Sequence, residues 1–234
     1  RRFQGSRLMS PQKKGPGTAE RIVHAALDLF SQKGYDGVSV KEIAAAVGIR
    51  DASLYKHFSS KQAIFDTIVS EMNNRLAAKS RELVLPDATT EDASSRYANL
   101  TLPDLTELSD RVFLFYLKDP FVSKYRRMLS LEQFHDSSLS DMYRQFFMED
   151  AITYQTAVFK QLVAAGAFIP VDPKVIAVAF YAPIFFLLSR YDNRPDEEAN
   201  ALALLNRQIA EFYRIYREPM QKKPNPPARI RPGD

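Results

Sequence analysis

Cysteine is absent from the 234 residues, and histidine occurs only three times, as His24, His57 and His135. Without cysteine the chain cannot form a disulfide, a thiolate metal site or a cysteine nucleophile. The three histidines lie too far apart in the sequence to give the ligand spacing of a metal site. We therefore expect no metal and no cofactor, and the missing cysteines favour a reducing, cytoplasmic setting.

The sequence also lacks the motifs of enzymes and of membrane proteins. It contains no glycine-rich phosphate loop and no pair of carboxylates at a spacing that general acid–base catalysis would use. The longest apolar run, Val175 to Leu188, contains Pro183 and is too short to span a bilayer as a helix, so we expect a buried helix there. No secretory signal is apparent. We expect neither an enzyme nor a membrane partner.

Charge is distributed unevenly along the chain. Residues 1–81 carry 14 Lys and Arg against 7 Asp and Glu, residues 82–216 carry 13 against 19, and residues 217–234 carry 5 against 2. A basic N-terminal part joined to an acidic body is typical of a protein whose one end binds a polyanion. Chance variation among solvated side chains is the alternative explanation.

Apolar residues recur at helical spacing throughout, and no useful length of strand alternation occurs, so the sequence predicts an all-α fold. We expect a flexible basic arm over residues 1–17, a helix-turn-helix domain over 18–62, a larger helical domain over 63–217 and a disordered tail over 218–234. Helices are expected near 18–33, 40–47, 51–57, 61–83, 91–100, 104–117, 120–134, 139–166, 172–191 and 196–217.

The segment from Val40 to Phe58 has the pattern of a helix-turn-helix. Ser39 and Glu42 form a capping box at its start, and Gly48 can adopt the positive φ that a tight turn between two short helices requires. Gly48-Ile49 followed by Leu54-Tyr55-Lys56-His57-Phe58-Ser59-Ser60-Lys61 resembles the motif of TetR-type transcriptional regulators. The resemblance covers roughly residues 18 to 70.

This resemblance implies that the third helix enters the major groove of operator DNA. The polar and charged side chains expected to contact DNA are Lys41, Arg50, Asp51, Ser53, Tyr55, Lys56, His57 and Lys61. For Lys61 we expect a phosphate contact at a helix N-terminus. The basic arm either follows DNA or is an untethered tail.

Three of these residues have alternative interpretations. Tyr55 could instead pack its ring beside Phe58 in the core. Asp51 could cap the third helix or accept a hydrogen bond from cytosine N4, and Arg50 could contact guanine or a phosphate. Arg50 and Asp51 also depart from the usual family pattern, in which serine and then a variable polar residue follow.

The resemblance further implies that the helical body binds a small molecule and forms a homodimer. Candidate ligand contacts are Phe113, Tyr116, Phe134, Phe147, Asp150 and Tyr154, although any one aromatic ring could instead belong to the core. Glu132, Glu149 and Asp150 could face a cationic ligand or point to water. For the dimer interface we expect Phe180, Pro183, Leu187, Leu202, Leu205, Ile209 and Phe212, with intramolecular core as the alternative.

Together these features predict a ligand-responsive regulator, in our interpretation a repressor that releases a palindromic operator when a small molecule binds. The alternative is a dimeric interaction or ligand-binding protein of the same fold that does not bind an operator. A carboxylate at the DNA face, Asp51, is the best argument for that alternative.

Overall fold

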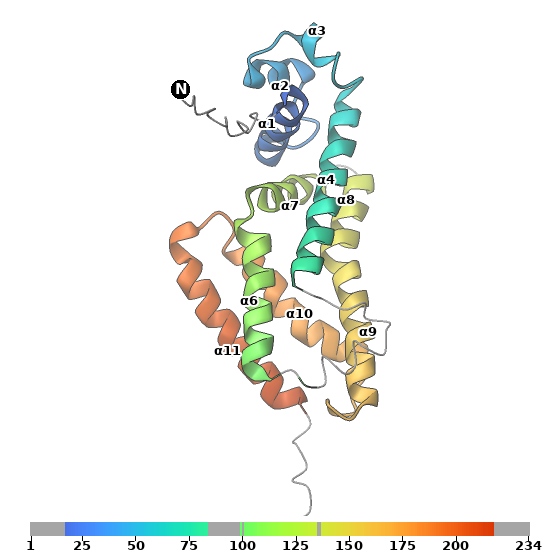
Figure 1. The fold of residues 1–234 in the computed structure, drawn as a ribbon, viewed down its shortest axis with the longest axis vertical. Coiled ribbons are helices and arrows are strands. Elements are labelled where there is room, and N and C mark those ends of the chain that lie inside the picture. The colour runs from blue at the N-terminus through green and yellow to red at the C-terminus, as the bar shows by residue number, and fades with distance from the viewer. Residues whose placement is uncertain (1–16, 84–98, 100, 135–136, 218–234) are drawn as a thin grey trace, which may run out of the picture. The chain divides into compact units, whose positions relative to one another are not determined.

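The computed structural model describes residues 17–83, 99, 101–134 and 137–217 (Figure 1). Within these residues the fold is helical without a strand, as the sequence predicted. The expected basic arm up to residue 16, the helix near 91–100 and the tail after residue 217 lie outside the described residues. The α-helices are α1 (Thr18–Lys33), α2 (Val40–Val47), α3 (Asp51–Leu54), α4 (Lys61–Glu82), α6 (Leu102–Lys118), α7 (Pro120–Glu132), α8 (Ser137–Arg144), α9 (Asp150–Ala164), α10 (Pro173–Arg190) and α11 (Glu198–Tyr216).

Two predicted helices differ from those observed. The helix expected over 139–166 is divided into α8 and α9 by a π-helical turn, Gln145–Glu149. The helix expected over 51–57 is α-helical only to Leu54, and its remaining residues continue as hydrogen-bonded turns, with Lys56 N donating to Ser53 O and His57 N to Leu54 O. Short 3₁₀-like turns of this kind are common where a helix ends.

The chain forms two compact units, and each is discontinuous in sequence. The first comprises residues 1–85 and 115–146, and the second comprises residues 86–114 and 147–234. The boundary therefore passes through α6 and through the π-helical turn. The domain boundary that the sequence predicted after residue 62 stays a prediction, because it was defined by function rather than by packing.

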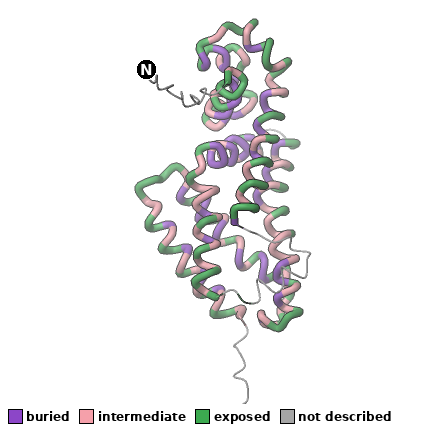
Figure 2. Tube along the Cα trace, in the orientation of Figure 1, coloured by how far each residue is buried: buried purple, intermediate pink, exposed green. Residues whose placement is uncertain are grey.

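The first unit has a core to which α1, α4 and α7 contribute. Its buried side chains include Ile22, Ala26 and Phe30 of α1, Ile64, Ile68 and Met72 of α4, and Phe121, Val122, Tyr125, Met128 and Leu129 of α7. Figure 2 shows α7 almost entirely in the colour of buried residues. Because α7 is buried on most of its faces, it forms a central support for the N-terminal helices rather than a surface helix.

In the second unit, α10 packs against α9 and α11. Four aromatic rings, those of Phe159, Phe168, Phe180 and Phe212, lie with centroids between 5.0 and 6.1 Å apart. Such tilted and edge-to-face pairs stabilise a core beyond the area they bury. Pro183 lies inside α10, which nevertheless continues to Arg190.

Candidate nucleic-acid interface

Hydrogen bonds hold the helix-turn-helix together, and the sequence predicted the capping box among them. The Ser39 side chain accepts from Glu42 N, while the Glu42 carboxylate accepts from Ser39 N at 2.8 Å, which confirms the capping box. Gly48 has φ of 76° in the left-handed region, and Ile49 N donates back to Ala44 O. The Arg21 guanidinium of α1 donates to Val47 O at 2.6 Å. These bonds fix where α2 begins and ends.

The recognition segment, residues 50–57, presents a polar surface over one apolar anchor. Leu54 is completely buried, as are Ile43 and Ala44 of α2, so the segment is packed onto the domain through one side. Arg50, Asp51, Lys56 and His57 are exposed, whereas Ser53 is half-buried. Lys41 is exposed on α2. The predicted DNA-contacting side chains of α2 and α3 are therefore available to a partner.

Two of the alternative interpretations disagree with the structure. The Tyr55 ring is 53% exposed, so it does not belong to the core. Arg50, not Asp51, is the N-cap of α3, and no side chain caps this helix. Asp51 is the first helical residue, and its carboxylate is exposed in the first turn. A negative charge at this place interacts favourably with the positive end of the helix dipole.

Lys61 lies in a different environment from the other candidates. Ser60 caps α4 by accepting from Ala63 N, so Lys61 opens the helix as expected. Its ammonium group, however, donates to Tyr35 O at 2.8 Å and to Val38 O at 3.1 Å, and lies 4.1 Å from the centroid of the Tyr35 ring. The amine thus binds the turn between α1 and α2, a contact that the sequence does not predict. An ammonium group has three N–H donors, and a phosphate contact through the third stays a prediction.

Comparison with known proteins agrees with this geometry. The family model described as bacterial regulatory proteins, tetR family, matches residues 22–68, which span α1 to α4. Over 50 residues the chain is 48% identical to IcaR of Staphylococcus aureus, a protein named as a negative transcriptional regulator of a biofilm operon. Residues 22–68 thus carry a helix-turn-helix that is similar to those of tetR-family regulatory proteins.

A second curated relative resembles the chain over a longer stretch. The chain is 33% identical over 86 residues to YdgC of Bacillus subtilis, named as an uncharacterized transcriptional regulator. These matches cover 21% and 36% of this chain, and 27% of IcaR and 44% of YdgC, so the chain spans less than half the length of either curated relative in alignment.

Solved structures resemble the fold over most of the chain. A TetR-family protein of Mesorhizobium loti has a TM-score of 0.60 at 20% identity, covering 86% of this chain and 97% of that one. A complex of SmeT with triclosan has a TM-score of 0.59 at 19% identity, covering 86% and 92%. At these identities the likeness establishes the TetR-type fold of a helix-turn-helix joined to a helical body.

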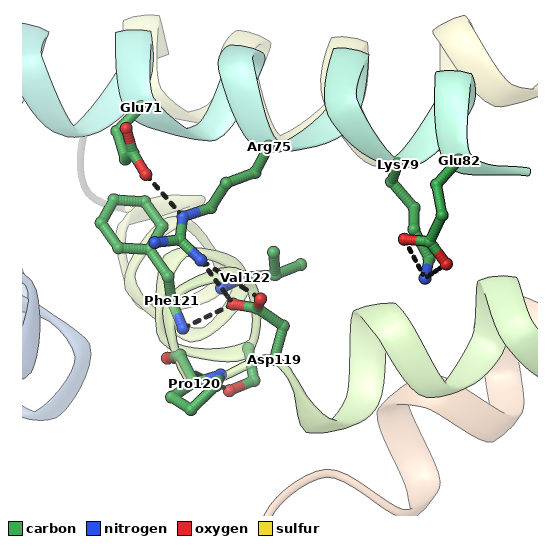
Figure 3. A network of polar contacts seen from close by, with 9 residues as sticks. Glu71, Arg75, Lys79, Glu82, Asp119, Pro120, Phe121 and Val122 are labelled. Carbon is green, nitrogen blue, oxygen red and sulfur yellow. Dashed lines mark hydrogen bonds and ion pairs between the residues drawn. The ribbon is translucent and has the colours of Figure 1, made fainter.

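The helix α7 contacts both α4 and α1, and Figure 3 shows its first turn beside Arg75 of α4. Asp119 caps α7 by accepting from Phe121 N and Val122 N, and it also accepts from Arg75 of α4 at 3.2 Å. The Arg75 guanidinium lies 4.7 Å from the centroid of the Phe121 ring, and the His24 ring of α1 meets the same ring edge-on at 5.7 Å. The first turn of α7 thus joins the two long helices of the DNA-binding unit.

The six candidate ligand contacts are distributed between the two units. Tyr116 and Phe134 belong to the first unit, whereas Phe113, Phe147, Asp150 and Tyr154 belong to the second. Phe113 and Phe147 are buried, Tyr116 and Tyr154 are half-buried, and Asp150 is exposed. Phe134 is 86% exposed, so in this structure its ring contributes to no enclosed site. Ligand binding by these residues stays a prediction.

The candidate dimer residues lie mostly inside the chain. Phe180, Leu187, Leu205, Ile209 and Phe212 are buried in the second unit, and Pro183 and Leu202 are half-buried. The helices carrying them do expose other apolar side chains. On α10 these are Val175, Val178 and Phe186, at a spacing that places them along one face, and on α11 they are Leu204 and Ile215. Most residues named for the dimer interface are thus buried within the chain, and their part in a dimer stays a prediction.

Proposed function

We propose that this chain is a transcriptional repressor that binds a palindromic operator as a homodimer. The observation that carries the proposal is the exposed polar recognition segment, residues 50–57, in a helix-turn-helix that matches the TetR family. The name of IcaR as a negative regulator supports repression rather than activation. A bound dimer can block transcription by occlusion alone, without a further surface for polymerase.

The residues of the recognition segment divide into two roles. Arg50 and Asp51, at the start of α3, read base edges: a guanidinium suits guanine O6 and N7, and a carboxylate suits cytosine N4. Tyr55, Lys56 and His57, at the end, contact phosphates and fix the register of the helix on the duplex. The exposure of all five side chains supports this division. A guanine–cytosine pair within each half-site follows from it.

A second copy of the chain covers the apolar faces of α10 and α11 in this proposal. Among the described residues, α10 is the one helix long and apolar enough to cross a membrane by length and composition, and only 33% of it is buried. Its exposed valines and phenylalanine support a partner helix packed against it. Two recognition helices related by a two-fold axis would then read half-sites about one helical turn apart. The proposed setting is the cytoplasm, where operator DNA is found.

Effector control is the third part of the proposal. SmeT, whose fold is similar, forms a complex with triclosan, and this supports a small-molecule site in this chain too. We consider two conformations that differ in the position of α4. An effector that binds one of them more tightly would shift the population of the DNA-binding conformation. The Arg75–Asp119 bond joins α4 to α7. A movement of α4 would therefore either break this bond or move α7 as well.

A protein of the same fold without operator binding is the second candidate function. The exposed carboxylate of Asp51 favours it, since a negative charge at a DNA face repels phosphates and caps nothing here. Selection of bound sequences from a random DNA pool, followed by salt titration on the enriched duplex, separates the two functions. We expect a palindrome and a steep dependence of affinity on salt. No enrichment by the purified dimer at low salt would favour the second candidate.

A further inference from the structure

The turn between α1 and α2, residues 34–38, is bound by a carboxylate from a distant part of the sequence. Glu132, the last residue of α7, accepts a hydrogen bond from Tyr35 N at 2.6 Å. Its side chain belongs to a residue only 4% exposed. Removing a carboxylate from water is costly unless it is hydrogen-bonded, so a buried glutamate at this position indicates a specific role for the bond.

Gly34 allows this close approach. Its φ of 77° lies in the left-handed region, and a Cβ added to it would collide with Glu132 Oε1. Gly34 also ends α1 as its C-cap. The same glycine therefore terminates the helix and leaves the space through which α7 reaches the turn, so two separate requirements fall on one position.

Tyr35 connects this carboxylate to the start of α4. While Glu132 holds its N–H, Lys61 holds its carbonyl at 2.8 Å and lies over its ring. The Tyr35 hydroxyl donates to Gln62 Oε1 at 3.0 Å, and burial raises the pKa of this phenol. An anion from α7 and a cation from α4 thus act on the two sides of one backbone residue.

Two other contacts between α7 and α1 lie away from this turn. Lys124 pairs with Asp28, and the Phe121 ring meets His24, both on the body of α1. These interactions hold the helices against each other along their length. Glu132 differs from them because its bond ends on the backbone of the turn that leads into the helix-turn-helix.

We propose that Glu132 is a positioning residue for DNA recognition: through Tyr35 and Lys61 it fixes the α1–α2 turn and the start of α4, and so the presentation of the recognition segment. This inference rests on the proposed function for its DNA readout. It gives α7 a connection of its own to the DNA-binding helices, in addition to the ion pair with α4. Nothing in the bond requires Glu132 to touch DNA.

Three substitutions at this position test the proposal in the full-length protein. Glu132→Gln keeps an oxygen acceptor of the same reach, Glu132→Asp keeps the charge but withdraws it by one methylene, and Glu132→Leu removes the acceptor. Lys124→Gln is the matched control, since it breaks an α7–α1 ion pair that does not touch the turn. Each variant is examined by hydrogen–deuterium exchange and by titration with the duplex selected by the wild-type protein.

We expect the Asp and Leu variants to speed exchange in peptides covering residues 34–38 and 49–63, with unchanged exchange in α9 and α10. Their operator affinity should fall about tenfold, the effect of losing one hydrogen bond to a charged group. The salt dependence should stay unchanged because no phosphate contact is removed. Glu132→Gln and Lys124→Gln should resemble the wild type in both measurements.

Faster exchange at the turn with full operator affinity would overturn the positioning role. So would faster exchange throughout the molecule, because it indicates a general contribution to stability. A loss in Glu132→Gln as large as in Glu132→Leu would also overturn it, because the retained oxygen acceptor would then make no difference. If the wild-type protein selects no DNA sequence, the proposed function fails instead. Exchange at residues 49–63 then still decides whether Glu132 orders the recognition segment.

Discussion

Tyr55 and Lys56 are neighbours at the end of the recognition segment, yet they offer DNA different chemistry. Lys56 brings a full charge, so Lys56→Ala should weaken binding to every sequence and lower the slope of log affinity against log salt by about one. Tyr55→Ala should weaken binding to every sequence without changing that slope, because a phenol releases no counterion. Salt titrations on the selected operator and on an unrelated duplex distinguish the two.

Lys160→Ala, an exposed lysine on α9, is the control for this pair because it changes net charge equally. An unaltered slope in Lys56→Ala would exclude Lys56 from the phosphate contacts. A slope reduced equally in the Lys160 variant would mean that only the overall charge matters.

Glu42 is the residue whose contacts give the helix-turn-helix a dependence on acid. A hydrogen bond from Lys33, followed by those from the backbone and hydroxyl of Ser39, lowers the pKa of Glu42 to about 2 from an ordinary value of 4.5. A lowered pKa stabilises the fold above the unfolded value, and this contribution is lost as pH falls from about 4.5 through about 2. In Glu42→Gln the free energy of unfolding, measured in urea, should depend less on pH across that range. An identical acid limb would contradict this assignment.

Local signals at the residue scale were readable from the sequence, whereas distant partners were not. The capping box and the positive φ of Gly48 each depend on residues within a few positions of one another. The bond between Glu132 and Tyr35 joins residues 97 positions apart, and no local pattern announces it. The place of Lys61 at a helix start predicts a phosphate contact. It does not predict the bonds that Lys61 donates to Tyr35 O and Val38 O, because these carbonyls lie in a distant turn of the chain.

At the scale of the elements, the stability of α7 depends on the interactions of its first turn. Asp119 caps the helix and pairs with Arg75, so Asp119→Ala should remove both interactions and destabilise the protein by about 1–2 kcal/mol, the usual cost of a lost cap. Asp119→Asn should be milder, because an amide oxygen still accepts from the backbone while the charge on Arg75 loses its counterpart. Thermal or urea unfolding measures both. Equal losses in the two variants would mean that the ion pair, not the cap, carries the stabilisation.

The division of one expected helix into α8 and α9 shows a limit of periodicity. Apolar residues continue at helical spacing across Gln145–Glu149, so the sequence predicts an unbroken helix. In the structure the π-helical turn brings Phe147 into the second unit, where its carbonyl accepts from the Tyr181 hydroxyl at 2.6 Å. A π-helical turn alters which carbonyls are free to accept, and here the acceptor is used by a tertiary contact. The sequence pattern could not predict this turn, because the hydrogen bond depends on where α10 places Tyr181.

At the scale of the whole molecule, the apolar faces of α10 and α11 lead to a prediction about assembly. Phe186 is 60% exposed on α10, so Phe186→Asp should shift the protein from dimer to monomer by placing a charge in the proposed interface. Sedimentation velocity at several concentrations reports the change, and Thr153→Asp on α9 is the matched control. A stable dimer in the Phe186 variant would remove this face of α10 from the interface.

Helical periodicity explains why the sequence named the inward residues of α10 and α11 for the dimer. A pattern of apolar residues identifies faces that avoid water, but it does not distinguish a face covered by the same chain from one covered by a second copy. Phe180 and Phe212 form an aromatic pair at 5.0 Å within the chain, while Phe186 and Ile215 remain exposed. The packing of α9 and α11 against α10 shows which apolar residues this chain covers itself. A dimer through the exposed ones stays a proposal.

The discontinuity of the first unit has a consequence for how this protein is made. A chain leaving the ribosome presents α1 to α4 first, then residues 86–114 of the other unit, and only afterwards α7 and α8. The bond that Tyr35 makes to Glu132 cannot form until synthesis has passed that residue. A nascent chain therefore cannot complete the proposed DNA-binding surface early. A chimeric regulator that carries only residues 1–85 on another body would lack α7 and its bond to the α1–α2 turn.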